Sequence, residues 1–372
     1  AILGAALILV AVLVRLIPAT TRVGAPFEQE ILLNSGFGAT YLNQLFGDYA
    51  LRYEVYGGGP LYEFLVNVWT LISVNTLWVR LLSVIFSVAT LVTAFLFIQR
   101  KVTGPTAALM FAFLAFHPLT VDVGSTINSV SVAAFFVMLS VYHSVEWLGR
   151  NGEKAKAKTT LATLAAVYTH PAAWPLIVFY MLVAVTTRLH PGFRPRDAIK
   201  PVVGMVLGSV PMWPAIVRRI VTRGEIPDSG WSALQTLALS QPFGGSLDNA
   251  IGGSGPLAVL ASSGDEGIGA LIVLAGLPAI VLTLIGAVRH AFVAWLFFLP
   301  LALLAFVDRS FGQFDPKLIV MFVPAALGCL SAGVGELNKR RGAWMWVGRA
   351  AGAYTLGVFG LVTLYLIINT AP

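Results

Sequence analysis

Cysteine is almost absent from this chain, since Cys329 is the one thiol among its 372 residues. A single cysteine excludes an intrachain disulfide framework and any cysteine-based zinc site. Charge is also scarce, because Asp, Glu, Lys and Arg together make up 11% of the residues. The sequence contains no glycine-rich loop of the nucleotide-binding type and no internal repeat. These absences argue against a soluble enzyme that uses ATP or a nucleotide sugar, and against a transporter built from inverted repeats.

Apolar residues dominate instead, at 57% of the chain. A soluble domain of this length cannot bury so much apolar surface, so the composition predicts an all-α integral membrane protein. At roughly 20 residues for each crossing, the apolar runs predict about 11 transmembrane helices. The runs are 2–18, 78–98, 106–118, 130–148, 160–168, 172–187, 202–217, 268–288, 291–307, 318–334 and 346–368.

The charges sort by loop. Taken alternately, the loops of one set hold 15 of the 24 Lys and Arg residues but only four of the 17 acidic residues. Basic residues accumulate in cytoplasmic loops, so the pattern places the N-terminus and the loops around Arg100, Arg150 and Arg289 in the cytoplasm. The net charge of +7 then reflects membrane topology, and no nucleic-acid partner is expected. The acidic loops lie outside the cell.

Two of the outside loops, 19–77 and 218–266, are too long to be simple turns, and loops of such length are usually functional or disordered. In the first loop, the apolar run 61–72 is too short to span a bilayer comfortably, which predicts a juxtamembrane helix lying in the interface. Two shorter amphipathic runs precede it, 27–33 and 41–49. The chain 1–372 is thus expected to form a single transmembrane module.

Most side chains capable of chemistry fall on the outside, in the first loop or at span ends. They are Glu28, Glu30, Asp48, Glu54, Glu63, Asp122, His117, His170, Arg218, Arg219, Asp308, Arg309, Asp315 and Lys317. The acids come mainly from the first loop and the bases from later span ends. A site between them would combine a general base with a surface for phosphate. Transfer of a sugar from a membrane-held phosphosugar needs both.

Each of these residues also has a plainer structural role open to it. Glu28 and Glu30 follow Pro26, so they could serve as first-turn acids of a helix. The two histidines each precede a proline at a span end, where a polar interfacial anchor is common. The pair Arg218-Arg219 could snorkel to lipid headgroups. The residues alone leave these alternatives open.

Seven segments add a pattern in their order and spacing. They are Phe27-Glu28-Gln29-Glu30-Ile31, Gly59-Pro60-Leu61-Tyr62, Arg80-Leu81-Leu82-Ser83-Val84-Ile85-Phe86, Gln99-Arg100-Lys101-Val102-Thr103-Gly104, His117-Pro118-Leu119 with Asp122, Tyr168-Thr169-His170-Pro171, and the stretch from Lys317 to Pro324. Together they resemble the GT-C superfamily of membrane glycosyltransferases. Within it, the protein O-mannosyltransferase and lipid A aminoarabinose transferase group is the most similar.

The resemblance implies an enzyme that takes a sugar from a polyprenyl or dolichyl phosphate at the outer face. It implies Glu30 or Glu28 as the catalytic base, with Asp122 orienting the acceptor or, together with Glu30, holding a divalent metal. The remaining implied roles are donor-phosphate binding by Arg218, Arg219, Arg309, Lys317 and His170, and acceptor orientation by His117. The chain departs from the family pattern where Gln29 replaces an aspartate and where Gly58-Gly59 replaces a His-Pro pair.

The leading hypothesis is an inverting glycosyltransferase of a prokaryotic cytoplasmic membrane. Its donor would be a polyprenyl-phosphate sugar, and its acceptor a lipid, a glycan or a protein. The departures from the family pattern leave a second hypothesis open, a catalytically degenerate GT-C-fold subunit that is a structural component of a larger membrane complex. A lipid or solute transporter is the third, and the spans offer it no charged residue near their middle.

Overall fold

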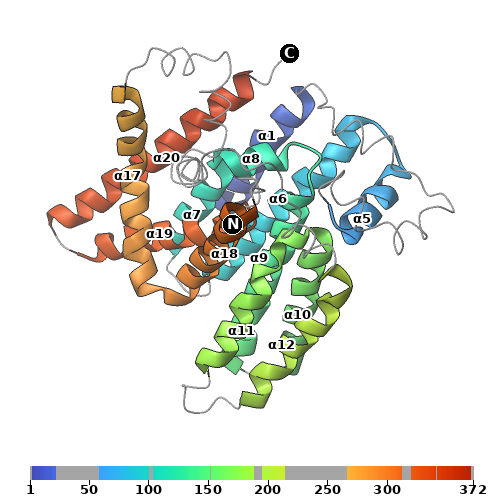
Figure 1. The fold of residues 1–372 in the computed structure, drawn as a ribbon. Coiled ribbons are helices and arrows are strands. Elements are labelled where there is room, and N and C mark those ends of the chain that lie inside the picture. Colours follow the sequence, from blue (N-terminus) through green and yellow to red (C-terminus); the bar gives the residue numbers. More distant parts are fainter. Residues whose placement is uncertain are drawn as a thin grey trace.

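The computed structural model describes residues 2–21, 58–99, 104–150, 152–187, 195–213, 266–311, 320–340 and 342–369. Within these ranges all regular structure is helical and there is no strand (Figure 1). The predicted amphipathic runs 27–33 and 41–49 lie outside the described residues, as does most of the second long loop.

Each apolar run that was predicted to span the membrane coincides with a helix. These helices are α1 (Ile2–Thr21), α6 (Thr76–Gln99), α7 (Gly104–Phe116), α9 (Ser129–Arg150), α10 (Glu153–Thr169), α11 (Pro175–Thr187), α12 (Pro195–Ser209), α17 (Glu266–Arg289), α18 (Ala291–Phe311), α19 (Val323–Lys339) and α20 (Ala343–Asn369). The predicted juxtamembrane run is α5 (Pro60–Thr70). Helices α10 and α12 each begin seven residues before the predicted run. In α10 the added residues include lysine and alanine, which are strong helix formers.

Prolines set several helix boundaries. Helix α7 ends at Phe116, and Pro118 then occupies the first turn of a short helix that the sequence did not predict, α8 (Pro118–Gly124). Pro60 starts α5 in the same way, and Pro171 starts a 3-10 turn, η1 (Pro171–Ala173). Proline suits these positions because the first N–H groups of a helix have no intrahelical partner.

Helices α9, α10, α11 and α12 form one group, drawn in green to yellow-green in Figure 1. A buried polar cluster joins three of them. The Ser140 hydroxyl of α9 lies 2.7 Å from the Thr163 hydroxyl of α10 and 2.8 Å from the Tyr180 hydroxyl of α11. All three residues are buried. In a membrane the lipid tails are as apolar as the helix surfaces, so the hydrophobic effect does not drive helices together. Interhelical hydrogen bonds of this kind stabilise their association instead.

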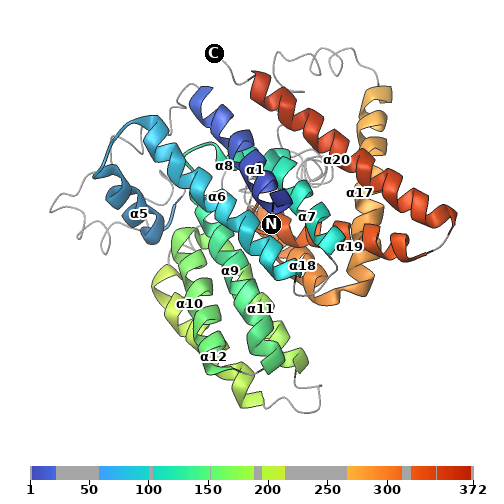
Figure 2. The same cartoon turned by 180° about the vertical axis from the view of Figure 1, so that it is seen from behind.

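A second group contains α17, α19 and α20, on the opposite side of α1, α6 and α7 from α5 (Figures 1 and 2). Two glycines allow α17 and α19 to touch. A Cβ atom at Gly286 of α17 would overlap the Cys329 carbonyl of α19, and one at Gly333 of α19 would overlap the Leu282 carbonyl. Backbone contact through small residues is typical of helix pairs in membranes.

Contacts between helix ends define one end of the molecule, called here the first-loop end. It contains α5, α8, the C-terminal ends of α1, α7, α10 and α12, and the N-terminal ends of α6 and α9. Arg80 of α6 donates to the Ala19 carbonyl of α1, and Tyr168 of α10 donates to the Gly208 carbonyl of α12. Thr363 of α20 donates to the Phe116 carbonyl of α7. The alternation predicted from the charged loops is therefore visible in these helices.

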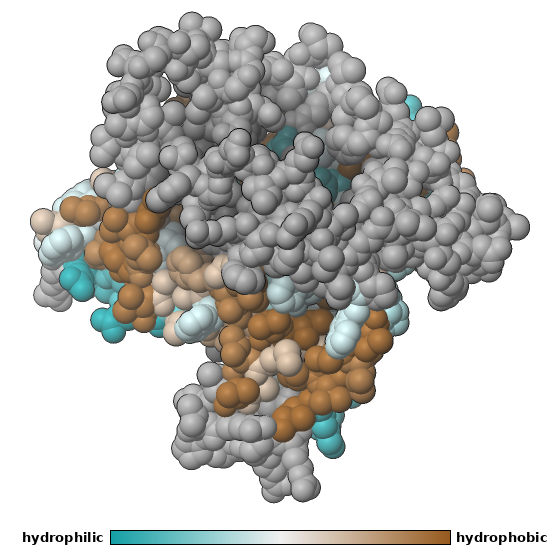
Figure 3. Space-filling model, viewed as in Figure 1, coloured by the Kyte–Doolittle hydropathy of each residue, from teal (hydrophilic) through white to brown (hydrophobic). Residues whose placement is uncertain are grey.

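The outward faces of many helices are apolar. Leu161, Leu207 and Val288 are each at least 65% exposed, and Figure 3 shows hydrophobic surface over the lower helices of that view. Exposed apolar surface of this extent marks contact with lipid or with another protein. By length and composition, two helices of the described part could cross a bilayer alone, Thr76–Gln99 and Ser129–Leu148.

Candidate functional site at the first-loop end

Helix α5 brings the end of the first long loop directly against the end of α10. The Gly59 N–H donates to the Thr169 carbonyl over 2.6 Å. A Cβ at Gly59 would overlap the Tyr168 carbonyl, and one at Gly58 would lie 2.6 Å from the Tyr62 ring. Both positions therefore require glycine for this close approach, which gives a structural reason for the missing His-Pro pair.

The other end of α5 is fixed to α6 by two tryptophans. The rings of Trp69 and Trp78 stack with centroids 4.7 Å apart and planes 9° from parallel. Each indole N–H donates to the other residue's carbonyl, at 2.7 and 2.9 Å. Because both ends of α5 are fixed, the segment that follows the acidic part of the first loop has a defined position over α6 and α10.

His170 lies at this junction, one residue beyond the carbonyl that Gly59 contacts. Its ring is buried, with 3% of the residue exposed. The Nδ1 atom accepts a hydrogen bond of 3.1 Å from the Ala172 N–H and so caps η1. That bond fixes the ring orientation.

His117 and Asp122 belong to the α7–α8 junction. His117 is 1% exposed, and its ring meets the Phe359 ring of α20 edge-on, with centroids 5.0 Å apart. Its carbonyl accepts from the Thr120 hydroxyl at 2.8 Å. Asp122 is half-buried on α8, and its carbonyl accepts from the Ser125 N–H at 3.2 Å. Asp122 is thus the one acidic residue of α8, and its backbone lies in the last turn of that helix.

Arg15 of α1 is a buried charge at this end, and it bonds to groups of α6, α7 and α8. It is 0% exposed, and sequence reasoning counted it among the outside bases without giving it a role. Its Nε donates to the Ser87 hydroxyl of α6 at 2.7 Å. Its Nη1 and Nη2 groups donate to the carbonyls of Ala115 and Leu114, each at 3.2 Å. It also donates to the Ala11 carbonyl and the Thr120 hydroxyl, at 3.1 and 3.3 Å. All five guanidinium donors are therefore used.

Two of the three carbonyls that Arg15 binds, those of Leu114 and Ala115, belong to the last turn of α7. That turn carries the negative end of the helix dipole and has no intrahelical donors, so a cation there is favourable. Gly124 of α8 packs over the same group, since a Cβ there would lie 2.6 Å from the Ser87 hydroxyl. The available sequence signal was a lone arginine in an otherwise apolar run, which is costly in a membrane unless it has partners.

The other predicted site residues are not brought together by the described residues. Glu28, Glu30, Arg218, Arg219 and Lys317 lie outside them, and Arg309 is described only as part of the α18 backbone. In the part of the chain that is described, no three His, Cys, Asp or Glu side chains gather as a metal site. Asp122 contributes one carboxylate, which does not by itself fit a divalent ion.

Comparison with known proteins gives no match to a protein-family model and no match among curated proteins. Solved structures do match. ArnT from Cupriavidus metallidurans in the apo state has a TM-score of 0.59 and 12% identity, over 99% of this chain and 77% of ArnT. The same protein bound to undecaprenyl phosphate has a TM-score of 0.55 and 13% identity, over 100% of this chain and 75% of ArnT.

The oligosaccharyltransferase of Archaeoglobus fulgidus, in complex with Zn and sulfate, has a TM-score of 0.44 and 13% identity, over 95% of this chain and 53% of that one. This likeness is too distant to support an argument. ArnT is a lipid A aminoarabinose transferase of the GT-C superfamily. The GT-C fold predicted from the sequence is therefore confirmed, and at this identity the likeness concerns the fold alone.

Proposed function

We propose that the chain is a glycosyltransferase that moves a sugar from a polyprenyl phosphate to an acceptor at the first-loop end. The observation that carries the proposal is the likeness to ArnT over nearly the whole chain, including an ArnT structure that holds undecaprenyl phosphate. The protein would lie in a prokaryotic cytoplasmic membrane with the first-loop end outside. Its acceptor would be a lipid, a glycan or a protein.

The buried end of the bundle supports a site in this position. Arg15, His117 and His170 are all buried there and hold the ends of α7 and α10 in fixed positions. The acidic part of the first loop joins α5, whose position over α6 and α10 is fixed at both ends.

The proposed chemistry uses one carboxylate and several cations. Glu30 or Glu28 takes the proton of an acceptor hydroxyl as its oxygen attacks the anomeric carbon. The bond from that carbon to the phosphate oxygen breaks, and the polyprenyl phosphate leaves from the opposite face, which inverts the configuration. Its developing charge is stabilised by the predicted phosphate ligands, Arg218, Arg219, Arg309, Lys317 and His170.

A transfer assay tests the assignment of the base. In membranes that contain the Glu28→Gln/Glu30→Gln variant, transfer of labelled sugar from a polyprenyl-phosphate donor should fall by at least ~100-fold, the usual contribution of a general base. Glu146→Gln is the matched control, because Glu146 is an exposed glutamate near the opposite end of α9. Unchanged transfer in the double variant would exclude these glutamates as the base.

The alternative is a degenerate GT-C-fold subunit of a larger membrane complex. It is motivated by the loss of the aspartate at Gln29 and of the His-Pro pair at Gly58-Gly59. The second departure has a packing explanation, since a side chain at Gly59 would overlap the Tyr168 carbonyl. Stable co-purification with partner proteins, without donor binding by the wild-type chain, would favour this alternative over the enzyme.

A further inference from the structure

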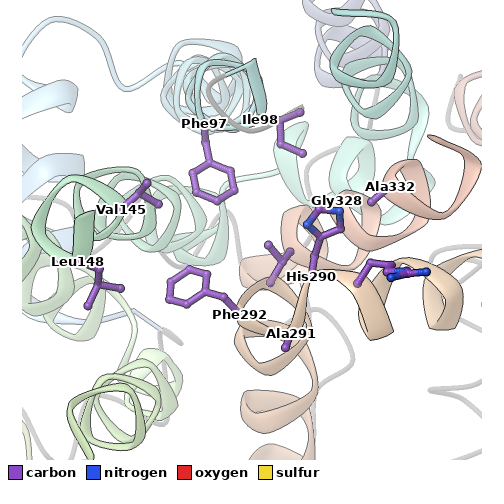
Figure 4. A pocket seen from close by; sticks show the side chains of 11 residues that line it. Phe97, Ile98, Val145, Leu148, His290, Ala291, Phe292, Gly328 and Ala332 are labelled. Carbon is purple, nitrogen blue, oxygen red and sulfur yellow. The ribbon is translucent and has the colours of Figure 1, made fainter. Parts of the chain in front are cut away.

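A cavity of about 510 Å³ lies away from the first-loop end. It opens between the C-terminal parts of α6 and α9 on one side and the junction of α17 with α18 on the other. Figure 4 shows the rings of Phe97 and Phe292 and the imidazole of His290 pointing into the same space. Its volume falls within the range of about 300–1,000 Å³ that is typical of small-molecule sites.

The lining of this cavity is apolar except at one edge. Phe97, Val145, Leu148 and Phe292 supply hydrocarbon from three helices, and the polar edge consists of Arg289 and His290. The cavity is therefore amphipathic, with an apolar interior and a cationic rim.

One acid lies near the rim, Glu336 of α19, which interacts electrostatically with Arg289 and His290. Its ion pair, at 2.6 Å, is with Lys339. Arg289 is exposed and His290 is half-buried. An anion at the rim would therefore add favourable electrostatic energy without breaking an existing pair.

We infer that this cavity binds one anionic glycerophospholipid, with an acyl chain between Phe97 and Phe292 and its phosphate at Arg289 and His290. Basic pockets between membrane helices on the face rich in Lys and Arg are suited to anionic headgroups. The inference depends on immersion of the chain in a membrane and does not depend on sugar transfer.

The cationic rim favours this occupant over the tail of a polyprenyl phosphate. A polyprenyl tail reaching the cavity from the first-loop end would bring no charge to Arg289. A phospholipid entering from the adjacent leaflet places its phosphate at the rim and its hydrocarbon inside, which matches both parts of the lining.

Lipid titration of the purified, delipidated chain tests the inference. Dioleoyl-phosphatidylglycerol should raise the melting temperature and remain bound in native mass spectrometry, whereas dioleoyl-phosphatidylcholine should do neither. In Arg289→Gln/His290→Gln the apparent affinity for phosphatidylglycerol should be about fivefold weaker, the loss expected for one basic group beside an anionic lipid. The control Lys154→Gln/Lys158→Gln removes two exposed cations of α10 and should bind like the wild type.

A second variant tests the apolar part. At Gly328 a Cβ would lie 3.4 Å from Val293 and 3.6 Å from Ile98, both of which line the cavity. Gly328→Leu should therefore fill the space and abolish phosphatidylglycerol binding while the rim stays intact. Equal responses to the two lipids, or equal losses in the rim and control variants, would overturn the inference. If undecaprenyl phosphate displaced phosphatidylglycerol from the wild-type chain, and Gly328→Leu no longer bound undecaprenyl phosphate, the cavity would belong to the donor tail instead.

Discussion

At the scale of single residues, Arg15 is a fully buried charge whose five donors join α1 to three other helices. Its guanidinium provides donors to the last carbonyls of α7 at the point where α7 gives way to α8. A membrane arginine usually signals a substrate path or a water-filled cavity. Here all its donors bind protein groups, which joins α1 to α6, α7 and α8.

Arg15→Met should therefore destabilise the first-loop end by more than the change in side-chain volume alone would. Each buried carbonyl left without a donor costs about 1–3 kcal/mol. We expect a lower melting temperature and increased hydrogen exchange in α7 and α8. Arg349→Met is the control, since Arg349 is exposed and its guanidinium lies over the Trp346 ring. Equal effects of the two substitutions would show that Arg15 has no special structural role.

At the scale of helices, the contact between α17 and α19 depends on two glycines. Gly286→Leu should separate the helices, because its side chain would enter the Cys329 backbone. We expect a loss of stability of several kcal/mol, beyond the about 1–3 kcal/mol typical of overpacking with methylenes. Gly360→Leu on α20 has no atom within 4 Å of its Cβ and should change stability little. Thermal unfolding in detergent measures both, and equal melting temperatures for the two variants would contradict the contact.

The helices were the part of the fold that the sequence could predict, because the apolar runs and the prolines that end them are local signals. Helix α8 was missed because seven residues between two longer runs give no periodic pattern. The partners of Arg15 were missed for a different reason. Apart from Ala11, they lie 72 to 105 residues away along the chain, and only the packing of α1 against α6, α7 and α8 brings them together. The candidate site suffers from the same difficulty, since its acids and bases come from opposite halves of the chain.

At the scale of the whole molecule, the alternation of helix ends makes the orientation testable. The turn after α5 should lie outside the cell and the start of α10 inside. In a Cys329→Ala background, a membrane-impermeant thiol reagent should label Val74→Cys in intact cells. Lys154→Cys should react only after the membrane is opened. Both positions are exposed, so access decides the result. Labelling of Lys154→Cys in intact cells would reverse the orientation.

The proposed function requires the first-loop end to bind a lipid-linked phosphate. The most direct measurement is the affinity of the purified chain for undecaprenyl phosphate, compared between Arg218→Ala/Arg219→Ala and the opposite-end control Lys154→Ala/Lys158→Ala. We expect binding by the wild type and the control, and at least about tenfold weaker binding by the arginine variant, because charge-assisted hydrogen bonds contribute about 1.5–3 kcal/mol. Absence of binding by the wild-type chain would exclude the proposed function.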